Sequence, residues 1–257
     1  MKKLILIVAL TFGILNISTA QGAVTMKSND AGDIERETKV LRCEELTEIV
    51  SLLPTVVRIV EGEEGLVEIV YPKAEADYLK FIVKGGNILT LGRDADKKMA
   101  KNTLVTEHNP IEVRVSASTI NYILNRSDMS LYIERDAFAD VLTIGNSGGL
   151  FIHADTISAD VINIVSQGTT TCLVKEWRAN SLMLTNTGAL YVKGVTNARK
   201  IEHHSAGIDN VELDVACSTL EMLSNGSGVI EYRGTADEVT ISSMGTATIR
   251  TSELNRE

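Results

Sequence analysis

Aromatic side chains, cysteine and positive charge are all scarce in this chain of 257 residues. One Trp, six Tyr and four Phe make up 4% of the chain, whereas hydrophobic residues of all kinds make up 44%. The interior must therefore be built mainly from layered aliphatic side chains. Lys and Arg number 25 against 34 Asp and Glu, a formal charge of −9. This acidic balance argues against nucleic acid and anionic membranes as partners.

Motifs that carry chemistry are scarce as well. The sequence has no phosphate-binding glycine loop and no CxxC pair, and none of its serines stands in a nucleophile elbow. We therefore predict no catalytic residues, no cofactor and no metal, and a protein that is not an enzyme.

Regular glycine spacing is the dominant positive signal. Consecutive glycines lie 20, 20, 19, 19 and 19 residues apart. They are Gly148, Gly168, Gly188, Gly207, Gly226 and Gly245. A repeat of this length is typical of a solenoid. We expect these turn glycines to need positive φ.

Other residue types keep the same register. A small polar residue stands two positions before each glycine: Asn146, Ser166, Asn186, Ser205, Ser224 and Ser243. Small residues stand nine positions before: Ala139, Ala159, Ala179, Ala198, Cys217 and Ala236. Aliphatic residues predominate six positions before and four positions after each glycine. An earlier turn fits with Met129 in the glycine place and Ser127 in the polar column. We expect the polar column to bond backbone groups or its neighbour one turn away.

The apolar positions alternate within each turn, as in Leu142 with Ile144, which is the period of a strand with one buried face. Turns of this kind must stack to bury that face, about 4.8 Å apart. We predict an all-β fold, a right-handed parallel β-solenoid over 118–252. Ile152, Val192, Val211 and Ile230 should form one buried stack, with Glu231 pointing outward.

The three cysteines do not form an evident disulfide. Cys172 and Cys217 fall in different columns about two turns, or ~9.6 Å, apart, which is too far for a bridge. We expect both to be small, reduced core residues. Cys43 has no assigned place.

The N-terminal segments differ from the repeat. Lys2 and Lys3, the apolar run 4–15 and the small residues Ser18 and Ala20 indicate a signal peptide over 1–20. No cysteine lies near its end, so we expect no lipid anchor and a soluble product in the periplasm or at the cell surface. Its removal also removes two lysines and leaves a charge of −11. Residues 21–39 are predicted to be a flexible leader.

Residues 40–117 are predicted to form a β-rich N-terminal cap, continuous with the solenoid as one structure over 40–252. Two hairpins are expected, 56–60 with 66–71 and 81–84 with 88–91. The strand 111–115 is a candidate first solenoid turn, with Asn109 in the glycine place.

Three sets of residues are weak ligand candidates. His203 and His204 are adjacent, so strand geometry sends them to opposite faces and argues against a shared metal. Asp140 and Asp160 face outward in one column and offer oxygen ligands for Ca²⁺, although Arg199 interrupts the column. Trp177 is either a sugar-stacking ring or, as we prefer, a buried structural one.

The order of these parts resembles the putative auto-transporter adhesin, head GIN domain family (DUF2807) of exported Bacteroidetes proteins. The resemblance rests on 56–62, 82–91, the repeated Ser/Asn-x-Gly turns and above all the segment 225–234, and covers 40–250. The turns at 166–170 and 203–207 depart from the family's pattern. The resemblance implies a β-solenoid in the cell envelope and no chemistry.

Three functions remain open. The first is a non-catalytic binding or adhesion module that presents a solenoid face to a glycan, or to an envelope or host protein. The second is a purely structural envelope protein, and the third a polysaccharide-active β-helix enzyme, by fold analogy alone. No nucleic acid or membrane-spanning role is expected, and an oligomer is compatible with all three.

The export signal makes a direct prediction. The intact mass of protein from its native host should correspond to a chain that begins at or near Gln21, because signal peptidase cleaves after small residues. A mature cytoplasmic chain that retains Met1 would contradict the prediction.

Overall fold

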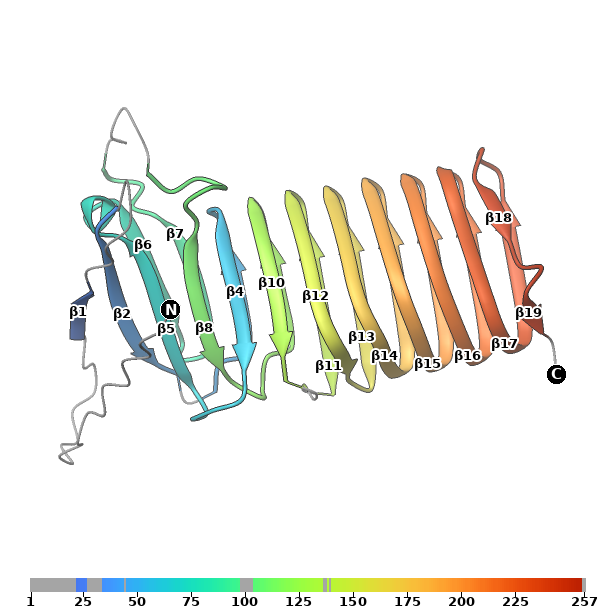
Figure 1. Ribbon diagram of the computed structural model, residues 1–257, viewed down its shortest axis with the longest axis horizontal. Helices are drawn as coiled ribbons and strands as arrows, with labels where there is room; N and C mark the ends of the chain where they lie inside the picture. Colours follow the sequence, from blue (N-terminus) through green and yellow to red (C-terminus); the bar gives the residue numbers. More distant parts are fainter. Residues whose placement is uncertain are drawn as a thin grey trace, which may run out of the picture.

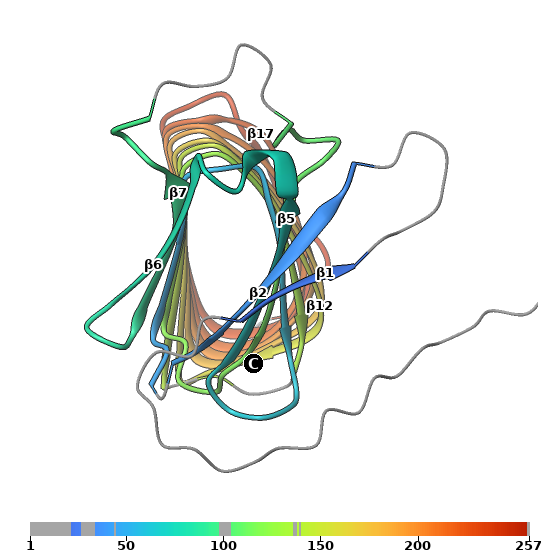
Figure 2. The ribbon, with the colours of Figure 1, turned by 90° about the vertical axis from the view of Figure 1, so that its left-hand side faces the viewer.

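A computed structural model describes residues 22–26, 34–43, 45–97, 104–135, 138 and 140–255. Strands coil into a parallel β-solenoid of about seven turns, drawn side-on in Figure 1. Seen along the rod in Figure 2, the turns superimpose into a flattened tube. The predicted all-β parallel β-solenoid is confirmed. The predicted signal peptide, 1–20, lies outside the described residues.

The N-terminal strands are short. They are β1 Gly22–Met26, β2 Arg36–Arg42, β3 Glu48–Ser51, β4 Thr55–Val60, β5 Leu66–Pro72, β6 Leu79–Lys84, β7 Ile88–Arg93, β8 Ile111–Ser116, β9 Tyr122–Asn125 and β10 Asp128–Glu134. One 3-10 turn, η1 Lys73–Glu75, follows β5.

Among the later strands, β14 to β17 are long, with 17 or 18 residues each, because they continue through the bends. They are β11 Val141–Asn146, β12 Gly149–Ser158, β13 Val161–Ser166, β14 Thr169–Asn186, β15 Ala189–Ser205, β16 Ile208–Ser224, β17 Ser227–Ser243, β18 Thr248–Arg250 and β19 Leu254–Asn255.

Stacking follows the predicted register from residue 142 onward. Leu142 pairs with Ile162 and Ile162 with Leu182, and the alanine column pairs at Ala179 with Ala198. Ile152, Val192, Val211 and Ile230 are at most 1% exposed, so the predicted stack is continuous and buried. Glu231 points outward and bonds Arg233. The inward and outward assignments are therefore confirmed.

Turn glycines do not have the backbone conformation that we predicted. The described glycines with positive φ include Gly228 (117°) and Gly234 (102°), and none of the six turn glycines is among them. What excludes a side chain is the turn below. A Cβ added to Gly168 would lie 2.0 Å from the Gly148 carbonyl oxygen, and one on Gly188 would lie 2.1 Å from that of Gly168. The positive-φ prediction was wrong, because the constraint is close approach of backbones.

The predicted register of the earliest repeat was wrong by two residues. Ile123 pairs with Ile144 and Asn125 with Asn146, so Asn125 occupies the polar column that was assigned to Ser127. Ser127 takes the glycine place instead of Met129: the Cβ of Gly148 would lie 1.8 Å from the Ser127 carbonyl oxygen. A shift of two residues preserves the facing of each side chain, which is why the error left the core pattern intact.

Solenoid turns continue into the N-terminal part, but not in chain order. On one face β8 stacks on β4, and β4 stacks on β10, all in parallel. After β1 and β2, the chain therefore enters the solenoid in the second turn with β3 and β4, forms the first turn with β7 and β8, and returns to the third turn with β9 and β10. Val113 pairs with Val57, so 111–115 belongs to the first solenoid turn, as predicted.

This crossing overturns one predicted hairpin and confirms the other. β4 and β5 do not pair with each other, because β8 lies between them: it is parallel to β4 and antiparallel to β5. β6 and β7 form the predicted hairpin across Gly85 and Gly86.

Antiparallel strands close the N-terminal end of the rod. β5 pairs with β2, and β2 with β1. β1 and the start of β2 fall within 21–39, so the segment predicted as a leader contains strand residues near both of its ends.

The close backbone approach predicts that Gly188→Ala destabilises the fold. The new methyl group would require neighbouring turns to separate, since it would meet the Gly168 carbonyl oxygen at 2.1 Å. We expect a loss of about 1–3 kcal/mol in the free energy of unfolding, measured by urea denaturation. Gly92→Ala is the matched control: its Cβ would make an ordinary 3.5 Å contact with Leu52 Cδ1. Equal effects of the two substitutions would contradict the account.

Candidate functional site

The predicted polar turn ladder lies inside the solenoid. Asn125, Asn146, Ser166, Asn186 and Ser224 are all at most 3% exposed, and Ser205 is 6% exposed. Ser243, in the last turn, is exposed. Such a column is available to the backbone of the chain and not to a ligand.

Its hydrogen bonds are those of a structural ladder. The Asn146 carboxamide accepts from the Gly148 amide (3.0 Å) and donates to the Gly148 and Thr169 carbonyl oxygens (both 2.9 Å). Asn186 repeats the pattern by accepting from the Gly188 amide (2.9 Å). Asn125 Nδ2 donates to Asn146 Oδ1 one turn away (2.8 Å). Both predicted bonding modes, to backbone and to a neighbouring turn, are therefore present.

Near the C-terminal turns the ladder joins a buried ionisable cluster. Asn186 Nδ2 donates to Asp209 Oδ1 (2.7 Å), and Asp209 Oδ2 lies 3.5 Å from His203 Nε2. His203 Nδ1 is 2.7 Å from the Tyr232 hydroxyl oxygen. His203, Asp209 and Tyr232 are all 0% exposed.

The pKa values of the two acids of this cluster shift in opposite directions. It raises the pKa of Tyr232, and the charge of Asp209 raises it further. Burial alone would also raise the pKa of Asp209. The hydrogen bond and charge of His203, helped by Ser205 and Asn186, outweigh burial and leave the pKa of Asp209 below its usual range. The cluster is sealed from solvent, so its role is to hold adjacent turns together.

Sequence reasoning placed His203 in an apolar column but missed Asp209 and Tyr232. The sequence did offer a signal for Asp209: this acidic residue stands in the same column as Leu150 and Leu190, which both face inward.

The weak ligand candidates do not converge. Trp177 is 0% exposed, so it is the buried structural ring that we preferred. Asp140 and Asp160 are exposed, and Asp160 accepts a hydrogen bond from Asn180. Among the described residues, no three His, Cys, Asp or Glu side chains are grouped so that they could hold a metal ion. Cys172 and Cys217 are free thiols, as predicted; Cys172 is buried, whereas Cys217 is only partly buried, contrary to the prediction. Burial raises the pKa of Cys172 to about 12.

A cluster of aromatic rings lies instead on the outer face of β10 and β12. Tyr132, Phe151 and His153 have ring centroids 6.0–6.4 Å apart, and the planes of Phe151 and His153 are nearly parallel, at 15°. The Arg58 guanidinium carbon lies 4.4 Å from the centre of the Tyr132 ring. We call Arg58, Tyr132, Phe151 and His153 the aromatic face.

These residues meet because of stacking. Tyr132 pairs with Arg58 on one side and His153 on the other, while Phe151 stands in the adjacent outward column. The signal was available in the sequence, because even the register shifted by two residues set Tyr132 beside Phe151, but the sequence analysis did not single out these rings.

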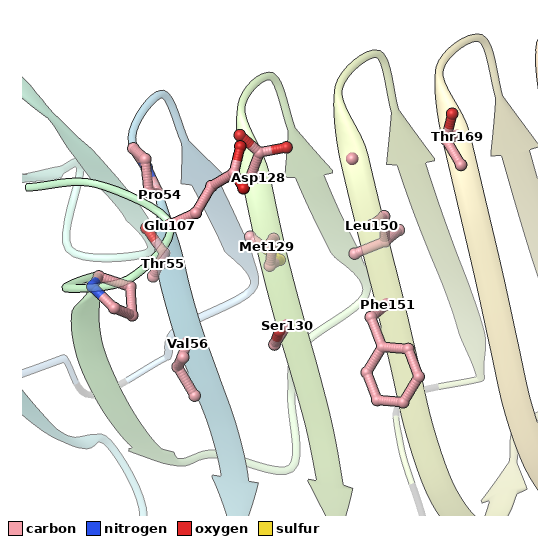
Figure 3. A pocket seen from close by; sticks show the side chains of 12 residues that line it. Pro54, Thr55, Val56, Glu107, Asp128, Met129, Ser130, Leu150, Phe151 and Thr169 are labelled. Carbon is pink, nitrogen blue, oxygen red and sulfur yellow. The ribbon is translucent and has the colours of Figure 1, made fainter.

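A pocket of about 310 Å³ adjoins the aromatic face (Figure 3). Val56, Ser130 and Phe151, one from each of β4, β10 and β12, line it in a single row across the strands. Glu107 and Asp128 also line it, and both are exposed. The pocket therefore offers an apolar wall, hydroxyl groups and carboxylates.

The same side of the rod becomes charged toward the C-terminus. Lys193 bonds Glu212 (3.0 Å), and Arg233 bonds Glu212 (3.3 Å) and Glu231 (3.1 Å). The hydrogen bond from Lys193, together with the charges of Lys193 and Arg233, lowers the pKa of Glu212 against the opposing effect of burial. Each of these charged groups already has an oppositely charged partner within the protein. The aromatic face is therefore the better candidate for a ligand site.

Comparison with known proteins agrees with this architecture. The family described as putative auto-transporter adhesin, head GIN domain, matches residues 174–257. The predicted resemblance is confirmed. Among curated proteins, none matches the sequence.

Solved structures with the same fold cover most of this chain. A putative adhesin from Bacteroides fragilis has a TM-score of 0.61 at 18% identity, covering 85% of this chain and 97% of its own. A putative adhesin from Parabacteroides distasonis has a TM-score of 0.63 at 16% identity, covering 85% and 98%. A putative lipid binding protein from the same species has a TM-score of 0.51 at 17% identity, covering 84% and 96%. At these identities the likeness establishes the fold.

The structure also shows whether a helix could span a membrane. No helix within the described residues has the length and apolar character needed to cross a bilayer.

The buried cluster predicts an acid-dependent contribution to stability. Because the pKa of Asp209 is lowered in the folded state, its contribution is present above the unfolded pKa of about 4 and is lost as pH falls through the folded value. Asp209→Asn should cost about 1–3 kcal/mol at pH 7, and less as pH falls below about 4. Urea unfolding of both proteins at pH 7 and pH 3 measures this.

Asp214→Asn is the control, since Asp214 is exposed and lies 3.9 Å from Arg233. It should change stability by less than about 0.5 kcal/mol. A cost for Asp209→Asn that stays constant down to pH 3 would show that the carboxylate charge is not what stabilises the cluster.

Proposed function

We propose that this protein is an exported, non-catalytic binding module of the cell envelope, and that its aromatic face holds a glycan chain. The carrying observation is the gathering of Tyr132, Phe151 and His153 on one outward surface of a chain with only 4% aromatic residues. The family match and the putative adhesins of the same fold support a binding role.

The chemistry of the face suits a sugar polymer. Aromatic rings present flat apolar surfaces against which the C–H faces of sugar rings can stack, and their edges remain close to hydrogen-bonding groups. Here the rings are held by strands and not by loops, so little conformational entropy is lost on binding. Ser130, Glu107 and Asp128 in the adjoining pocket supply acceptors for sugar hydroxyls.

A polysaccharide-active enzyme is the second candidate, because Glu107 and Asp128 line one pocket. Glycosidases need one of two carboxylic acids to stay protonated, and an apolar environment achieves this by raising its pKa. Both side chains are exposed to solvent, which favours binding over hydrolysis.

Glycan-array screening of the mature protein, followed by calorimetry of the best ligand, tests the proposal. Phe151→Ala and Tyr132→Ala should each weaken binding about tenfold, equivalent to 1.4 kcal/mol. Tyr122→Ala is the matched control, because Tyr122 is a half-buried outward ring on β9, outside the aromatic face. The proposal fails if no glycan binds or if Phe151→Ala leaves the affinity unchanged. Release of reducing ends that Glu107→Gln abolishes would favour the enzyme.

A further inference from the structure

The C-terminal end of the rod leaves a strand edge open. β17 pairs on its outer side with β18 over Val229–Glu231 and with β19 over Gly234–Thr235. In the described part of the chain, no strand covers the remaining stretch, 236–243. Figure 1 shows this strand at the far end of the rod from the cap. We call residues 236–243 the open edge.

Backbone groups of the open edge point out of the molecule. The Met244 amide donates to the Ser224 carbonyl oxygen (2.9 Å), as the Asn225 amide does to that of Ser205 one turn earlier (2.8 Å). Alternate residues of a strand direct their amide and carbonyl groups to opposite neighbours. The groups of Val239, Ile241 and Ser243 therefore face away from β16.

The hydrophobic core is also incomplete at this end. Leu220 and Met222 are 0% and 1% exposed because the next turn covers them. Val239 and Ile241 occupy the same two columns one turn later and are only partly buried. Met244, just beyond, is 78% exposed. A further layer of strand would complete the core as each earlier turn does.

The two ends of the rod differ in this respect. At the N-terminal end β6 covers β7 and β2 covers β5, both in antiparallel pairs. In the described part of the chain β6 and β1 have no partner on their outer sides, but they run antiparallel to the strands that they cover, so a head-to-tail filament would have to join two unlike edges. Two open edges can instead join each other around a two-fold axis, which closes the assembly.

We propose that the open edge pairs with the open edge of a second copy of this chain, in antiparallel orientation, to give an end-to-end dimer. In an antiparallel register centred on Thr240, the hydrogen-bonded pairs are formed by Val239 and Ile241, whose backbone groups face outward in both copies. This register sets Val239 opposite Ile241 of the second copy, so the two cores become continuous.

Charges on the open edge are compatible with this pairing. Its charged residues are Asp237 and Glu238. In the register centred on Thr240 they lie opposite Ser243 and Ser242 of the second copy, respectively. Like charges directly opposite each other would destabilise a strand pair, and this register avoids them.

Sedimentation velocity of the full chain over a range of concentrations tests the proposal. We expect a concentration-dependent dimer whose maximum dimension by small-angle scattering is nearly twice that of the monomer. Ile241→Pro should abolish the dimer while retaining the circular dichroism of the fold, because it removes an outward amide and none that bonds β16.

Cysteine cross-linking tests the register without a change that could unfold the chain. Thr240→Cys should form a disulfide-linked dimer under mild oxidation, because facing residues of a non-hydrogen-bonded pair are about 4.5 Å apart and within bridging range. Glu221→Cys, at the equivalent position one turn inside, should not cross-link, nor should the unaltered chain. A chain that stays monomeric at all concentrations, or a dimer with a compact side-by-side shape, would overturn the proposal.

Discussion

Contact between backbones in neighbouring turns is the constraint on which this structure depends. At the sharp bend of each turn the chain passes so close to the turn below that a methyl group would lie about 2 Å from a carbonyl oxygen. Glycine is needed there for lack of volume, not for freedom of φ. This contact recurs at each repeat, so it holds the turns in one register, and every other column inherits that register.

The buried polar ladder follows from the same bends. A chain that turns sharply around a narrow core leaves amide and carbonyl groups without strand partners, and buried groups of this kind are costly unless bonded. Asn146 and Asn186 satisfy them with their own carboxamides, two residues before each glycine. Where Asp209 replaces an aliphatic residue beside Asn186, its second carboxylate oxygen lies 3.5 Å from His203 Nε2, and His203 Nδ1 contacts the Tyr232 hydroxyl group. Ionisable side chains are thus retained in the interior for structural reasons.

Periodicity explains how much of this fold could be predicted from the sequence. The columns from Leu142 to Ile249 could be identified because each repeat offers an independent copy of the same pattern. Where the repeat degenerates, at Ser127 and Met129, a single copy was misplaced by two residues. The insertion of β3 and β4 between later strands could not be predicted at all, because alternation identifies a strand but not its neighbour. The place of Arg58 in the aromatic face could not be predicted for the same reason, because it requires β4 beside β10, whereas the neighbouring turns of Tyr132 and Phe151 were already stacked by the repeat.

The placement of the aromatic face and the open edge has a joint consequence. The face lies on β4, β10 and β12, near the cap, whereas the open edge belongs to β17 at the opposite end of the rod. An end-to-end dimer would therefore carry its two aromatic faces far apart on one long, rigid body. Two weak sites held at a fixed separation bind a polymer much more tightly than either does alone, provided the polymer can span them, because the second contact becomes intramolecular. A short oligosaccharide would gain nothing from this arrangement. Under the proposed function, selectivity for long chains would thus arise from the geometry of the rod, without additional contacts at either site.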